Sequence, residues 1–110
     1  MNNEIADLAL TVHELLINLN KRIEDMSGAF KRSGILEEER LLNLLDDLQS
    51  LAEGIEAISK DYPNLDLEEY REKLLQLTDA LEGRDTSLFF DLLQYELNPV
   101  LNYWSDCLKN

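Results

Sequence analysis

The sequence predicts an all-α protein, an up-down-up-down four-helix bundle that occupies residues 1–110 as a single domain. Leucine occurs 24 times, against 11 for valine, isoleucine and threonine together. Leucine favours helices, whereas branched and aromatic residues favour strands. Apolar residues also recur every three or four positions in four successive segments, which is the period of an amphipathic helix. Glycine and proline, which interrupt helices, number only four and two.

The first predicted helix covers residues 3–31. Its apolar residues form one stripe and most of its charged residues the opposite face. The stripe comprises Ile5, Leu8, Val12, Leu15, Leu19, Ile23, Met26 and Phe30. Residues 31–34, which end in Ser33 and Gly34, separate it from the next helix. We expect the Ser33 hydroxyl to cap that second helix.

The second predicted helix covers residues 35–60. Its stripe comprises Leu41, Leu44, Leu48, Leu51, Ile55 and Ile58. Three glutamates, residues 37–39, lie in the first turns, where the helix dipole favours negative charge. Gly54 lies inside the helix. It either permits a close contact with another helix or is a tolerated weak point, and the sequence does not choose between the two.

The third predicted helix covers residues 67–82. Pro63 ends the preceding segment, because proline cannot continue a helix. Asp66 and Glu69 have the spacing of a capping box, and Leu65 and Tyr70 that of a hydrophobic staple. Gly83 follows the helix and suits a left-handed cap.

The fourth predicted helix covers residues 87–108, with Asp85 or Thr86 as its cap. Pro99 falls inside the apolar pattern and removes the hydrogen bond to the carbonyl of Tyr95, so we expect a kink there. The phase of the stripe persists across Pro99, which favours one kinked helix over two short ones. The short connections make sequential helices antiparallel, and a four-helix bundle buries all four stripes.

The chain has 10 Lys and Arg against 23 Asp and Glu, a formal net charge of −13. Such a charge argues against nucleic acid and anionic membrane as partners, because both attract clustered basic residues. The chain lacks a basic secretory start and any apolar run of about 18 residues, so we expect a cytoplasmic protein. Cys107 is the single cysteine, which excludes an internal disulfide and a cysteine zinc site.

The residues that carry chemistry form no catalytic motif, so we expect a non-enzymatic protein without a cofactor or metal. His13 lies outside a zinc-protease pattern, because Ile17 stands where that pattern needs a second histidine. The alternative is a metal-dependent nucleotide hydrolase. Its Mg²⁺ would be held by helical carboxylates at a spacing of three, which lie on one helix face. These are Glu53, Glu56, Glu69 and Glu72. With 23 acids in the chain, a solvated acidic face explains such pairs more simply.

Surplus apolar residues on the second and fourth helices indicate a surface that binds a partner helix or a second copy of the chain. Adjacent residues on a helix diverge by about 100°, so one stripe cannot bury both members of Phe89-Phe90 or of Tyr103-Trp104 equally. The same holds for the leucine pairs near the start of the second helix and for Leu74-Leu75. The predicted partner-binding residues are Leu42, Leu45, Phe90, Tyr95 and Tyr103.

Residues 91–101 followed by Trp104 read D-L-L-Q-Y-E-L-N-P-V-L-x-x-W. This stretch resembles a pattern, D-L-L-x-Y-E-L-x-P-x-L-x-x-W, of an uncharacterised bacterial family of small acidic helical domains. The resemblance implies a bacterial origin and a built-in kink at Pro99, but no functional residue, because that family has no assigned activity. In size, acidity and helix count the chain is also similar to flagellar and type III export chaperones, an analogy of fold only.

Overall fold

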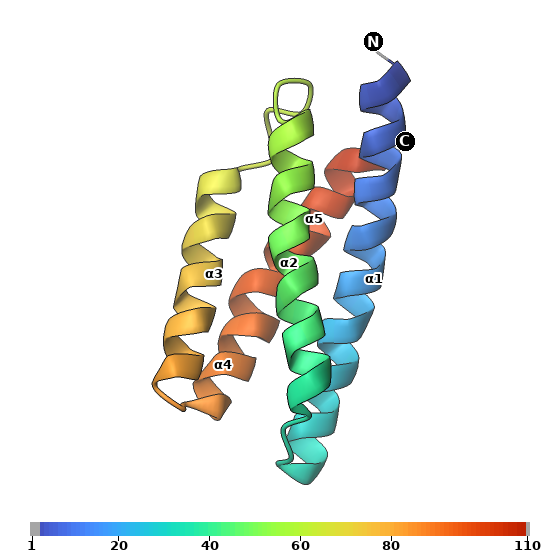
Figure 1. Cartoon of the computed structure of the whole chain (residues 1–110). Coiled ribbons are helices and arrows are strands. Elements are labelled where there is room, and N and C mark those ends of the chain that lie inside the picture. The colour runs from blue at the N-terminus through green and yellow to red at the C-terminus, as the bar shows by residue number, and fades with distance from the viewer. Residues whose placement is uncertain (1–2, 110) are drawn as a thin grey trace.

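The computed structural model describes residues 3–109, and it is helical in four rods with no strand in that range. The first three rods are α1 (Asn3–Ser33), α2 (Glu38–Ile58) and α3 (Leu67–Glu82). The fourth is continuous but has three parts: α4 (Thr86–Leu92), the π-helical turn η1 (Leu93–Leu97) and α5 (Asn98–Leu108). The predicted all-α fold with four helices is therefore confirmed. Successive rods run in opposite directions in Figure 1, which fits the expected up-down-up-down order.

The connection between α1 and α2 differs from the prediction. The Ser33 hydroxyl donates to the carbonyl of Ala29 at 2.9 Å and accepts from the Ile35 N–H at 3.1 Å, so it closes α1. Glu37 occupies the cap position of α2, and its side chain makes no capping bond. The expectation that Ser33 caps α2 is wrong, because Gly34 at φ +68° reverses the chain and three further residues precede α2.

The start of α3 is confirmed and its end is corrected. The Asp66 carboxylate accepts from the Glu69 N–H at 3.1 Å, as expected of a helix cap. At the other end Gly83 has φ −78°, and its N–H still makes the helical bond to the carbonyl of Asp79. The left-handed position falls one residue later, on Arg84 at φ +58°.

The fourth rod begins at a cap and changes pitch before Pro99. The Asp85 carboxylate accepts from the Leu88 N–H at 3.0 Å, which selects Asp85 over Thr86 as the cap. The Asn98 N–H bonds to the carbonyl of Leu93, five residues back, so the turn before Pro99 is wider than an α-turn. Pro99 has no N–H to donate, and the wide turn lets the rod continue past it. This geometry fits one bent helix.

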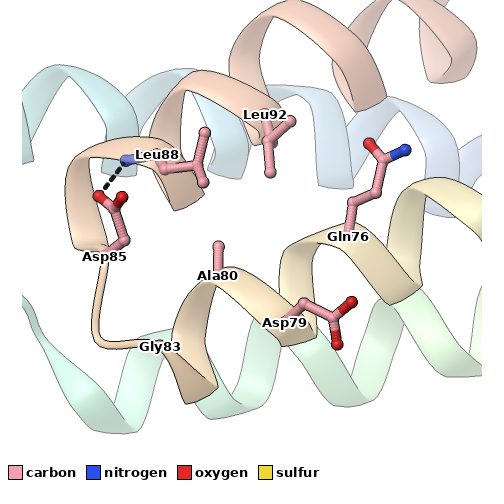
Figure 2. Close-up of a pocket in the computed structure, with 7 residues that line it drawn as sticks. All are labelled: Gln76, Asp79, Ala80, Gly83, Asp85, Leu88 and Leu92. Atoms are coloured by element: carbon pink, nitrogen blue, oxygen red, sulfur yellow. Dashed lines mark hydrogen bonds between the residues drawn. The ribbon is translucent and has the colours of Figure 1, made fainter.

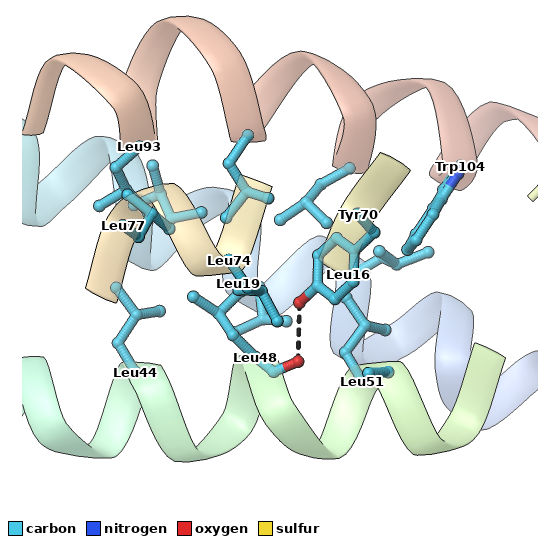
Figure 3. Close-up of a cluster of buried hydrophobic side chains, with 14 of the residues drawn as sticks. Leu16, Leu19, Leu44, Leu48, Leu51, Tyr70, Leu74, Leu77, Leu93 and Trp104 are labelled. Atoms are coloured by element: carbon cyan, nitrogen blue, oxygen red, sulfur yellow. Dashed lines mark hydrogen bonds between the residues drawn. The ribbon is translucent and has the colours of Figure 1, made fainter. Parts of the chain in front are cut away.

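The core lies along the middle of the bundle, where stripes from all four rods meet. Figure 3 shows Tyr70 of α3 beside Trp104 of α5, with its hydroxyl toward Leu48 of α2. The two rings lie 4.9 Å apart and are almost wholly buried. The whole predicted stripe of α2 is buried: Leu41, Leu44, Leu48, Leu51, Ile55 and Ile58. The apolar stripes of the four rods therefore bury one another, as the periodicity predicts.

Gly54 of α2 allows a close approach to α1. A β-carbon added there would lie 3.0 Å from the Cγ2 of Val12, which is itself buried. Of the two interpretations open from the sequence, the structure supports close helix contact. The same pair of helices is joined at its edge by an ion pair between Arg22 and Asp47.

Candidate functional site

Eight large apolar side chains remain exposed on the described surface. They are Leu10, Ile17, Ile35, Leu42, Leu75, Leu88, Tyr95 and Tyr103. Single exposed apolar residues are ordinary in soluble proteins, whereas those that border a hollow mark a candidate binding surface. Two of the eight, Leu42 at 61% exposure and Leu75 at 62%, line hollows between α2 and α3.

The two hollows together are termed the α2/α3 groove. The first, of about 510 Å³, lies where the α1–α2 and α3–α4 connections meet and is lined by Leu36, Glu38, Leu41, Leu42, Leu81, Arg84 and Thr86. The second, of about 250 Å³, is lined by Gln49, Arg71, Leu74, Leu75 and Thr78. Figure 1 shows both connections at the same end of the bundle. Both hollows are open to solvent, and leucines make up four of the seven residues that line the first and two of the five that line the second.

Helix geometry places the two hollows in line. Leu42 and Gln49 are seven residues apart on α2, two turns along the same face, or about 10 Å. Leu45 lies between them and is partly buried against the core. On α3, which returns alongside, Leu81 lines the first hollow and Thr78 the second. The groove therefore follows the seam between α2 and α3.

Carboxylates surround the groove. Glu38 lines the first hollow, and four further exposed acids lie three, four or seven residues from a groove leucine or glutamine on the same helix. These four are Asp46, Glu53, Glu72 and Glu82. None of the five carboxylates forms an ion pair within residues 3–109. Of the two basic residues that line the groove, Arg71 is bound to Glu56 at 3.0 Å, and Arg84 lies at the end of the groove. The lining itself therefore holds one glutamate and two arginines, and the surroundings of the groove become acidic on balance through the four exposed acids beside it.

The structure does not bring the five predicted partner-binding residues together. Leu42 lines the groove and Leu45 lies beside it, partly buried. Phe90 is only 4% exposed, and its ring stacks on Phe30 of α1 with centroids 4.5 Å apart. The expectation that one member of Phe89-Phe90 is left outside the core is wrong. The rod lies against α1 and α3 together, so two faces of it are covered and both rings are buried.

Tyr95 and Tyr103 are exposed but lie elsewhere. The Tyr95 hydroxyl is 3.2 Å from the Nζ of Lys31, and that ammonium lies 5.4 Å from the ring centroid, which ties η1 to the end of α1. Tyr103 lines a separate hollow of about 300 Å³ beside Asn64 and Pro99. A side-chain hydrogen bond and a charge interaction with Cys107 raise the pKa of Tyr103.

Two further exposed leucines border hollows and are absent from the predicted partner-binding residues. The adjacent pair Leu74-Leu75 was expected to be unequally buried, and Leu75 is the exposed member. Leu88 borders a shallow hollow of about 480 Å³ on the other side of α3. Figure 2 shows this hollow between α3 and α4. Ala80 lies at the floor of the hollow and Asp79 at its edge. No signal in the sequence distinguishes Leu88 from a core residue.

The carboxylates that the hydrolase alternative assigns to Mg²⁺ do not form a metal-binding cluster in the described part of the chain. Within residues 3–109 no group of three or more His, Cys, Asp or Glu side chains is placed to hold a metal ion. Glu56 is instead bound to Arg71. His13 lies at the edge of the buried stripe of α1, half-buried beside Val12. The arrangement does not favour a metal-dependent hydrolase.

These features define an acidic all-α protein of four helices with an apolar groove on one seam. The chain matches the family described as Domain of unknown function (DUF8042) over residues 7–107, and it belongs to that family. No curated protein and no solved structure matches the chain. Among the described helices, none combines the length and the apolar character that a membrane crossing requires.

Proposed function

We propose that this protein is a non-enzymatic protein-binding domain that acts in the cytoplasm and takes a partner helix or a second copy of itself. The observation that supports the proposal is the placement of Leu42 and Leu75, both more than half exposed, in two neighbouring hollows of the seam between α2 and α3. Each would contribute about 1–2 kcal/mol if it became fully buried against a partner, because about 60% of each residue is still exposed. The exposed acids keep the free protein soluble while these leucines face water.

The bundle is suited to such a role because its core does not depend on the two exposed leucines of the groove. The stripe of α2 is buried, whereas Leu42 lies off that stripe and faces solvent. Because the helix pair and its groove are already ordered, binding a third helix does not cost the conformational entropy of ordering them. The free protein therefore already presents the bound conformation of the surface.

Oligomeric state and partner binding test the proposal. We would measure the mass of the purified chain by size-exclusion chromatography with light scattering. Chemical crosslinking in cells of the source organism, followed by mass spectrometry, would then identify contacts between chains. The proposal expects either a dimer or a reproducible crosslinked protein. A strictly monomeric chain whose crosslinks all fall within one molecule contradicts it.

A further inference from the structure

We propose that the α2/α3 groove binds one basic amphipathic helix from a partner protein. This inference rests on the proposed function and deepens it, because it names the surface and the chemistry of the occupant.

The shape of the groove fits a helix. Its two hollows lie about two helical turns apart along α2, one at Leu42 and one at Gln49. Side chains at positions i, i+3 or i+4, and i+7 of a partner helix lie on one face over the same distance. A helix of about 11 residues, or about 16 Å, spans the groove from Glu38 to Gln49. Two or three leucine-like anchors would therefore enter the hollows together.

The charge around the groove selects the occupant. The five rim carboxylates, which are those of Glu38, Asp46, Glu53, Glu72 and Glu82, form no ion pair in the described part of the chain. A helix with lysine or arginine beside its apolar anchors would place positive charge against them. A second copy of this chain would bring 13 further net negative charges to an acidic surface, so repulsion opposes self-association there. The same repulsion opposes an acidic helix, although Arg71 and Arg84 lie in the groove lining.

The probe is a synthetic 18-residue amphipathic peptide, with leucine at positions spaced i, i+4, i+7 and i+11, and lysine, glutamine and alanine elsewhere. A first control peptide has the same composition with the leucines scattered, and a second has glutamate in place of lysine. Binding to the full chain is followed by fluorescence anisotropy at about 0.15 M salt, where charge attraction beyond about 8 Å is screened.

The groove variant is L42Q/L75Q, and the matched control is L10Q/I17Q. The control residues are exposed to a similar extent, 60% and 54%, but lie on α1. All four changes leave the net charge unaltered. We expect the groove variant to bind the probe about 100-fold more weakly, since each lost anchor costs about tenfold or more. We expect the control variant to bind within about twofold of the wild type. Circular dichroism and thermal melts confirm that both variants remain folded.

Five outcomes would overturn the inference. Equal weakening in both double variants, or equal binding of the scattered peptide, would mean that the acidic surface attracts any cation. Tighter binding of the glutamate peptide would contradict the charge argument. No binding of any peptide, in a chain that light scattering shows to be dimeric, would overturn this occupant while the proposed function stands. A dimer that dissociates in L42Q/L75Q would assign the groove to a second copy.

Discussion

The phenol of Tyr70 in α3 donates a 2.7 Å hydrogen bond to the backbone carbonyl of Leu48 in α2 (Figure 3). The tyrosine ring is fully buried, and it packs against the ring of Trp104 in α5 at 4.9 Å. One side chain therefore joins three of the four rods. Burial raises the pKa of the Tyr70 phenol far above its ordinary value of about 10.

Replacing Tyr70 with phenylalanine removes the bond to Leu48 and keeps the ring. We expect Tyr70→Phe to lower the free energy of unfolding by about 1 kcal/mol, the usual net worth of one hydrogen bond. Urea unfolding followed by circular dichroism at pH 7 measures this. Tyr95→Phe is the matched control, because that hydroxyl is exposed, and we expect a change of less than about 0.5 kcal/mol.

The same phenol makes the fold sensitive to alkali. Below pH 10 the tyrosine holds its proton in both folded and unfolded chains, so its contribution to stability is constant. Above pH 10 the unfolded chain releases the proton while the folded chain retains it, because the folded pKa is raised. The free energy of unfolding then falls by about 1.4 kcal/mol per pH unit. Urea melts between pH 9 and 11 should show this slope in the wild type, and it should be shallower in Tyr70→Phe. Identical slopes would contradict the assignment.

At Gly54 we expect alanine to destabilise the protein, although helix propensity alone predicts a gain in stability. Alanine favours a helix over glycine by about 1 kcal/mol. At this site the added carbon would meet Val12 at 3.0 Å, and a buried β-branched side chain in a helix has one strongly preferred rotamer. We expect Gly54→Ala to be destabilising by about 1 kcal/mol net. In a double-mutant cycle with Val12→Ala, the loss should be smaller in the double variant than the sum of the two single losses. An increase in stability on Gly54→Ala alone would show that the helices do not touch closely.

Local signals predicted the elements that depend on local interactions. The start of α3 follows from the Asp66 cap, which contacts Glu69 three residues away. The buried stripe of α2 follows from spacing, because a helix places every third or fourth residue on one side. The wide turn η1 depends on the direction in which the fourth rod continues after Pro99, where it packs against α1. The spacing of apolar residues does not encode that direction.

The candidate site was predicted in part for the same reason. A helical wheel identifies Leu42 as lying off the stripe of α2, and it is exposed. It cannot tell how many neighbours surround a helix, so Phe90 was assigned to a surface although Phe30 covers it. The adjacency of Leu74 and Leu75 predicts that one of them is exposed, but its place in a hollow beside Gln49 of α2 is a tertiary relationship that spacing does not encode.

Ser27 of α1 is a buried hydroxyl that makes no hydrogen bond. The side chain is 1% exposed, so its hydroxyl has no access to bulk water either. An unsatisfied buried polar group costs about 1–3 kcal/mol, and alanine is a better helix former than serine. We expect Ser27→Ala to raise the free energy of unfolding by about 1 kcal/mol, measured by urea unfolding. Ser50→Ala on the exposed side of α2 serves as control, and its gain should be limited to the propensity term of a few tenths of a kcal/mol. A loss of stability in Ser27→Ala would indicate that the hydroxyl has a partner.

The turn between α3 and α4 distinguishes two adjacent residues. Arg84, at φ +58°, holds a conformation that glycine adopts without the steric cost of a side chain, whereas Gly83 at φ −78° does not need to be glycine. We expect Arg84→Gly to raise the free energy of unfolding by about 0.5–1 kcal/mol. Gly83→Ala should be neutral or slightly stabilising, because its added carbon would meet the Asp79 carbonyl at an ordinary 3.4 Å and alanine restricts the unfolded chain. The pattern of a helix followed by glycine predicts the reverse, a loss of about 1 kcal/mol in Gly83→Ala and no gain in Arg84→Gly. Thermal and urea unfolding of the two single variants therefore decide which residue carries the left-handed turn.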